Sequence, residues 1–215
     1  MKKRVIFEKG FTLVELLIVI ALIAILSVAV LATINPIEQT NKARDAKFKN
    51  DAAEVLSAIE RYYASQTSYS WNVGTQAVID KTADVAFESL DYRFGIIGDQ
   101  GSTDGDLIST SELKGSFKGK ESFVAGVLES NKMYVFHNGT SGSNYVCFHP
   151  AAKANRKADN VQLKCISGVS TIGGAAATAT LIDQAVGGCT VPATWTDVIS
   201  ATDANLLCVP EGLIN

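Results

Sequence analysis

An uninterrupted apolar stretch near the N-terminus constrains the fold of this chain more than any other feature. It runs over residues 11–34, which contain a single charged residue and neither proline nor glycine. As an α-helix rising about 1.5 Å per residue it would span roughly 36 Å, enough to cross a hydrocarbon core of about 30 Å with some tilt. We therefore predict a membrane-spanning helix. The basic residues before it predict a cytoplasmic N-terminus: Lys2, Lys3, Arg4 and Lys9.

The charged residue in this stretch is Glu15, four residues after its start. A carboxylate at the bilayer centre costs about 2.5–3.5 kcal/mol, and less near the interface. Two interpretations are open: the side chain reaches the headgroups and has no further role, or it pairs with a buried positive group. Cleavage after Gly10 would create such a group, the α-amino group of Phe11, about one helical turn from the carboxylate.

The segment KGFTLVE, residues 9–15, resembles the class III signal of type IV pilins and of the pseudopilins of type II secretion. The resemblance is specific over residues 9–35 and extends loosely along the helix to about Ala64. It implies cleavage after Gly10 by a prepilin peptidase, N-methylation of Phe11, and registration of the next subunit by Glu15 through that amine. It also implies a precursor in the inner membrane, partners in the assembly machinery there, and a homo-oligomeric extracellular filament.

From residue 35 onward the composition is polar, but the helical pattern continues. One apolar stripe follows at steps of three and four: Phe48, Ala52, Val55, Ile59 and Tyr62 or Tyr63. Two pairs are spaced for i,i+4 ion pairs on the helix surface: Glu38 with Lys42, and Asp45 with Lys49. Pro36 removes one backbone hydrogen bond and clashes with the preceding turn, which predicts a kink or a locally melted segment over residues 32–36.

The rest of the chain predicts an antiparallel sheet. Apolar runs over residues 122–128, 132–137 and 144–149 are separated by turn residues and form a three-stranded meander that packs on the helical stripe. Residues 66–120 are harder to interpret; a short strand over 92–97 is expected within a long connection. The fold class is therefore α+β and pilin-like. The expected segments are a cleaved leader 1–10, a membrane or filament-core helix 11–35, an amphipathic helix 36–65, a connection 66–120, and a sheet with C-terminal loops 121–215.

Four cysteines follow the apolar stretch, and an even number outside the membrane favours disulfides. Three connectivities are open. We prefer Cys147 with Cys165 and Cys189 with Cys208, because each bond would then close one local loop. A zinc site is the alternative, but no Cys-x-x-Cys pair is present, and His137 and His149 are better interpreted as ordinary strand or strand-end residues.

Three other patterns suggest sites more weakly. The loop around residues 98–106 offers Asp99, Asp104 and Asp106 as calcium ligands, although their spacing does not match an EF-hand. The basic residues within 153–164 could touch DNA: Lys153, Arg156, Lys157 and Lys164. Removing the leader leaves 15 basic and 21 acidic residues, so the acidic total argues against nucleic acid as a partner. A glycosylation-type sequon begins at Asn138.

Evidence for an enzyme is thin, because the chain has no phosphate-binding loop, nucleophile elbow or metal-binding helix motif, and no cofactor is expected. The sequence favours a structural subunit of a type IV pilus-like filament. The alternatives are a minor pilin or type II secretion pseudopilin, or an anchored extracellular binding domain that does not polymerise.

Overall fold

The structure is a computed structural model, and it describes most of the helical region and the greater part of the sheet. The described residues are 10–66, 85–89, 104–123, 128–138, 143–167, 180–184, 187–197 and 202–212. The chain forms two compact units, Met1–Thr40 and Asn41–Asn215. The predicted leader lies outside the described residues, except for Gly10.

Helix α1 (Leu13–Thr33) contains 21 residues and accounts for most of the predicted apolar stretch. Its apolar side chains are exposed within the chain, as expected for a helix surrounded by lipid or by other subunits. The few polar side chains in the helix bond to its own backbone. The hydroxyl of Ser27 donates to Ile23 O at 2.7 Å, and that of Thr33 donates to Val30 O at 2.8 Å.

The helical path is interrupted between Thr33 and Pro36. Ile34 is extended, with φ −98° and ψ 127°. A new helix, α2 (Pro36–Gln66), starts at the proline, whose fixed φ and missing N–H suit the first helical position. Asn35 caps this start, because its side-chain oxygen accepts from the N–H of Glu38 at 3.2 Å. The proline therefore begins a second helix and does not bend a continuous one.

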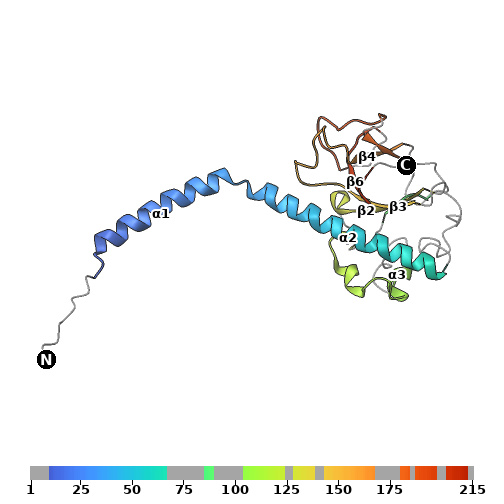
Figure 1. Ribbon diagram of the computed structural model, residues 1–215, viewed down its shortest axis with the longest axis horizontal. Helices are drawn as coiled ribbons and strands as arrows, with labels where there is room; N and C mark the ends of the chain where they lie inside the picture. Colours follow the sequence, from blue (N-terminus) through green and yellow to red (C-terminus); the bar gives the residue numbers. More distant parts are fainter. Residues whose placement is uncertain are drawn as a thin grey trace, which may run out of the picture. The chain divides into compact units, whose positions relative to one another are not determined.

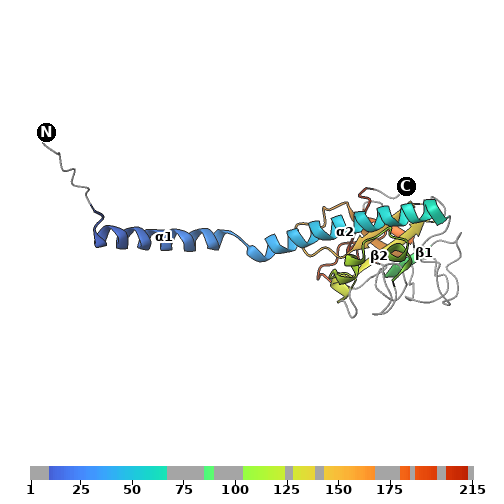
Figure 2. The ribbon, with the colours of Figure 1, turned by 90° about the horizontal axis from the view of Figure 1, so that it is seen from below.

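The predicted stripe of α2 is confirmed. Phe48, Ala52, Val55 and Ile59 are fully buried, and Tyr62 is buried whereas Tyr63 is 45% exposed. Figures 1 and 2 show α2 lying along one face of the sheet, where these side chains join the largest apolar cluster. The 3.6-residue periodicity thus positions the helix on the sheet.

In the described part of the chain the sheet has six strands in the order β1-β2-β3-β6-β4-β5, and every pairing between these strands is antiparallel. The strands are β1 (Val85–Ser89), β2 (Met133–Asn138), β3 (Ser143–Phe148), β4 (Leu163–Ser167), β5 (Thr180–Asp183) and β6 (Leu206–Val209). The described residues between β1 and β2 include three short helices: α3 (Asp106–Ser109), η3 (Gly115–Gly119) and η4 (Glu129–Asn131). The last strand, β6, lies between β3 and β4, so the C-terminal segment completes the middle of the sheet.

The predicted hairpin of strands 132–137 and 144–149 is confirmed by β2 and β3. The predicted strand at 122–128 is wrong at its start, because residues 121–123 form a turn; residues 124–127 lie outside the described residues. The strand beside β2 is instead β1, from the region that was hardest to interpret. The strand expected at 92–97 also lies outside the described residues.

Alternating side chains bury both faces of the sheet. Met133 and Val135 belong to the cluster under α2, whereas Tyr134 and Phe136 belong to a second cluster on the opposite face. This alternation decides which cysteines can meet. Cys165 lies in the cluster under α2, whereas the side chains of the cysteines in β3 and β6 lie in the second cluster.

The four cysteines form two disulfides, as predicted, but the preferred pairing is wrong. The bonds join Cys147 to Cys208 and Cys165 to Cys189. Cys147 and Cys208 are directly opposite in the β3–β6 register, with Cα atoms 4.0 Å apart. The preference for local loops failed because β6 returns from the end of the chain to pair with β3.

A buried carboxylate ties α2 to the loop that follows β3. Asp45 is only 2% exposed, and its two oxygens accept the N–H groups of Ala151 at 2.7 Å and Ala152 at 3.0 Å. The amide of Asn155 donates to it at 2.7 Å. The expected surface pair with Lys49 is therefore wrong, since Lys49 instead pairs with Glu211 at 2.6 Å.

Candidate functional site

The predicted cleavage site lies immediately before α1, outside any regular secondary structure. Gly10 and Phe11 precede the helix, and the Phe11 side chain is 83% exposed. Among the described residues, no atom beyond Gly10 and its chain neighbours lies within 4 Å of where a Cβ at Gly10 would be. Packing within the chain therefore does not require glycine here, and a requirement for glycine would have to come from a processing enzyme.

A capping box fixes the first residue of α1. The N-cap is Thr12, with φ −80° and ψ 150°, and its hydroxyl oxygen accepts the N–H of Glu15 at 3.2 Å. In return, Oε2 of Glu15 accepts both the backbone N–H and the hydroxyl of Thr12, each at 2.9 Å. These reciprocal bonds satisfy donors that a helix start otherwise leaves without partners.

The capping box gives the carboxylate of Glu15 a partner within its own chain, which neither sequence interpretation anticipated. Both of these bonds end on Oε2, and Oε1 accepts none of the hydrogen bonds found among the described residues. The second oxygen is thus available to a donor from outside the chain. Because Phe11 precedes the cap, the bond between Gly10 and Phe11 stays off the helix and in reach of an enzyme.

This signal was visible in the sequence, because Thr-x-x-Glu directly before an apolar run is the pattern of a capping box. Thr12 is the residue of the site whose role sequence reasoning missed. Of the described helices, α1 alone is long and apolar enough to cross a membrane, over Leu13–Leu31 with a mean hydropathy of 3.0. Glu15 lies in the first turn of that span, where a carboxylate is less costly than at its centre.

The expected calcium ligands are not brought together by the described part of the chain. Asp99 lies outside it. Asp104 forms an ion pair with Lys118, and Asp106 accepts the hydroxyl of Tyr62 at 3.2 Å. Burial raises the pKa of Asp106, against the opposing effect of the Tyr62 hydrogen bond. Within the described ranges, no group of three or more His, Cys, Asp or Glu side chains is arranged to hold a metal ion.

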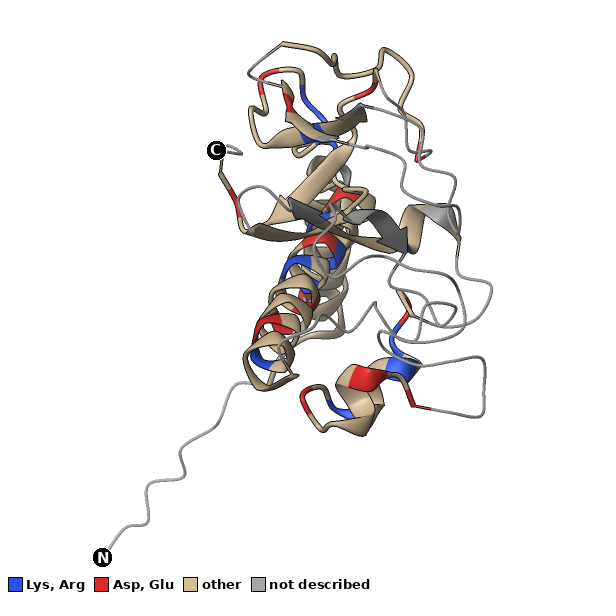
Figure 3. Ribbon diagram, turned by 90° about the vertical axis from the view of Figure 1, so that its right-hand side faces the viewer, with Lys and Arg blue, Asp and Glu red and all other residues tan. Residues whose placement is uncertain are grey.

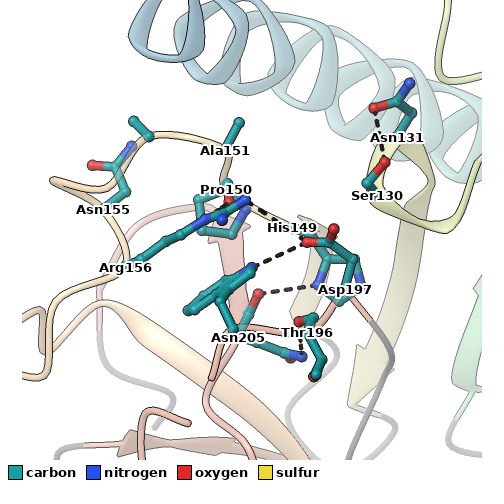
Figure 4. Close-up of polar contacts among 12 residues, drawn as sticks. Ser130, Asn131, His149, Pro150, Ala151, Asn155, Arg156, Thr196, Asp197 and Asn205 are labelled. Atoms are coloured by element: carbon teal, nitrogen blue, oxygen red, sulfur yellow. Dashed lines mark hydrogen bonds and ion pairs between the residues drawn. The ribbon is translucent and has the colours of Figure 1, made fainter. Parts of the chain in front are cut away.

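The basic residues of 153–164 do not form one surface. Lys164 is 1% exposed, pairs with the equally buried Asp183 and donates to Gly212 O at 2.6 Å. Arg156 donates to Pro150 O at 2.6 Å and lies 3.8 Å from a carboxylate oxygen of Asp197 (Figure 4). Lys153 and Lys157 remain exposed. Lys164 and Arg156 therefore stabilise the fold through internal contacts.

Buried polar contacts also explain one of the two histidines. His149 is fully buried, and its Nδ1 lies 3.1 Å from Asn205 O (Figure 4). Its ring packs edge-on against Tyr134, with ring centroids 6.0 Å apart. The contact with Asn205 connects the loop after β3 to the residues before β6, and the ring contact connects it to β2. The side chain of His137 and the last two residues of the sequon at Asn138 lie outside what the structure describes.

Comparison with known proteins identifies the N-terminal segment. Residues 7–31 match the family model of the prokaryotic N-terminal methylation motif. The match covers the Gly10–Phe11 bond, the capping box and most of α1. Neither the curated proteins nor the solved structures include a chain that matches this one.

Proposed function

We propose that this chain, which carries the class III signal of type IV pilins and pseudopilins, is a structural subunit of a type IV pilus-like surface filament. A signal of this kind implies processing by prepilin peptidase and assembly into pilus-type filaments. It is typical of structural proteins, not of enzymes. In this proposal α1 anchors the precursor in the inner membrane and later packs in the core of an extracellular filament.

The observation that carries the proposal is the arrangement at the start of α1. An exposed Gly10–Phe11 bond precedes a capped apolar helix whose single carboxylate keeps one oxygen available. After cleavage and methylation, the amine of Phe11 in one subunit would meet Glu15 of another. Breaking such a pair from one side, where water is excluded, costs about 3–5 kcal/mol.

Replacing Glu15 tests this pairing. Glu15→Ala should leave folding and cleavage intact but block or slow assembly, because the neighbour's amine loses its partner. Glu15→Gln is the matched variant, since an amide oxygen can still accept from the N–H of Thr12 but carries no charge. We expect both variants to be processed and neither to appear normally in sheared filaments. Normal filaments from Glu15→Gln would refute the role of the charge.

Replacing Gly10 tests the cleavage site independently. No described residue beyond the chain neighbours packs against this position, so Gly10→Arg should not disturb the described fold. It should leave an unprocessed precursor in the membrane, because a processing enzyme that requires a small residue would reject the long side chain. If the variant is still trimmed to Phe11, the cleavage assignment is wrong.

A further inference from the structure

From residue 42 onward, the charged side chains of α2 fall into two groups. One group makes internal contacts: Arg44, Asp45, Lys49, Asp51 and Arg61 bond to loops, strand ends or other side chains of the same unit. The other group is exposed and makes no ion pair or hydrogen bond with the described part of the chain: Lys42, Lys47, Glu54 and Glu60. Basic and acidic residues both occur along the helices in Figure 3. The described contacts of the fold therefore give no role to the four charges of the second group.

These four charges lie on two flanks of the helix. Glu60 follows Lys42 by 18 residues, about five turns, so the two lie on the same flank. Glu54 follows Lys47 by seven residues, about two turns, so these two share a flank as well, roughly 140° from the first. On each flank the basic residue is nearer the N-terminus and the acidic residue nearer the C-terminus.

Small uncharged side chains separate the two flanks. They follow at steps of three and four along the exposed side of α2: Ala43, Ala46, Asn50, Ala53 and Ser57. Short side chains at a helix contact permit a small distance between the axes. Together with the four flanking charges, these residues are named here the outward face of α2. A second helix can approach this face closely only if the charges that it places beside the flanks are opposite in sign to those of the flanks.

We propose that the outward face of α2 docks onto the same face of a second, parallel copy displaced along the helix axis by 12–13 residues, about 18–20 Å. Two parallel helices that face each other place opposite flanks side by side. Glu54 follows Lys42 by 12 residues and Glu60 follows Lys47 by 13. One displacement therefore places Lys42 of one copy beside Glu54 of the other, and Lys47 of the first copy beside Glu60 of the other. The inference rests on the proposed function, because subunits that point the same way and are displaced axially are what a filament provides.

Charge reversal tests this displacement. In the full chain, Lys42→Glu and Glu54→Lys should each lower the amount of sheared filament at least about five-fold, since one attractive contact becomes repulsive at every interface. The double variant K42E/E54K should return the yield to within about two-fold of the unchanged chain. The level of processed chain in the membrane fraction is expected to stay constant throughout, because these side chains are exposed and make none of the described internal contacts.

The matched control is K47E/E54K, which has the same net charge and the same number of reversals on the same face. It should not rescue assembly, because both aligned pairs would then hold like charges. Rescue by this control, or filament yields unchanged by the single reversals, would overturn the proposed displacement while leaving the proposed function intact. If the unchanged chain gives no sheared filament, both proposals fail together.

Discussion

The buried carboxylate of Asp45 gives the sharpest test of how α2 is fixed to the sheet. Asp45→Ala removes the acceptor for two backbone N–H groups, those of Ala151 and Ala152, and both residues are buried. A buried donor left without a partner costs about 1–3 kcal/mol, and bonds to a charged acceptor lie at the upper end. We therefore expect the variant to lose about 3–5 kcal/mol, a large part of the stability of a typical domain.

The assay is urea unfolding of the full chain in detergent, followed by tryptophan fluorescence, because Trp195 packs under Arg156 in the globular unit. Glu54→Ala is the matched control on the same helix, since Glu54 is exposed and makes none of the described contacts. The control should change the free energy of unfolding by less than about 0.5 kcal/mol. A loss below about 1 kcal/mol for Asp45→Ala would refute the reasoning.

Two further predictions concern the disulfides and pH. Peptide mapping should find Cys147 joined to Cys208, and a map with any other pairing would contradict the sheet topology. Replacing both cysteines with serine should lower the free energy of unfolding by about 4 kcal/mol in the chain-entropy model, with the other disulfide unchanged. Burial raises the pKa of Asp106 in the folded chain, so the folded chain binds this proton more tightly than the unfolded chain. The contribution of Asp106 to the free energy of unfolding should fall as pH rises from about 3.9 through the raised folded pKa. Asp106→Asn should remove this part of the pH dependence of unfolding. An identical pH dependence in the variant would show that burial of the Asp106 carboxyl is not the source of that dependence.

The parts of the fold that depend on nearby residues could be predicted from the sequence. The stripe of α2 and the β2–β3 hairpin follow from periodicity and turn residues within short windows. Asp45 could also have been found, because it lies three residues before Phe48 and thus on the apolar stripe. A carboxylate at such a position is buried and needs donors.

The rest depends on contacts between segments far apart in the sequence. The position of β6 between β3 and β4 determines the disulfide pairing, and no local pattern around Cys208 encodes it. The strand β1 is short and pairs with β2 across an irregular register, so its five residues carry little periodic signal. At the candidate site, Gly10, Phe11 and Glu15 came from the sequence, whereas the hydrogen bonds of Thr12 required the structure.

The most direct test of the proposed function is the N-terminal sequence and intact mass of this chain in material sheared from the cell surface, compared with the membrane fraction. We predict an abundant sheared species that begins at methylated Phe11 and contains both disulfides. A processed chain found only in membranes would instead indicate a minor pilin or pseudopilin. A chain that still begins at Met1 would contradict the proposal and leave an anchored extracellular domain.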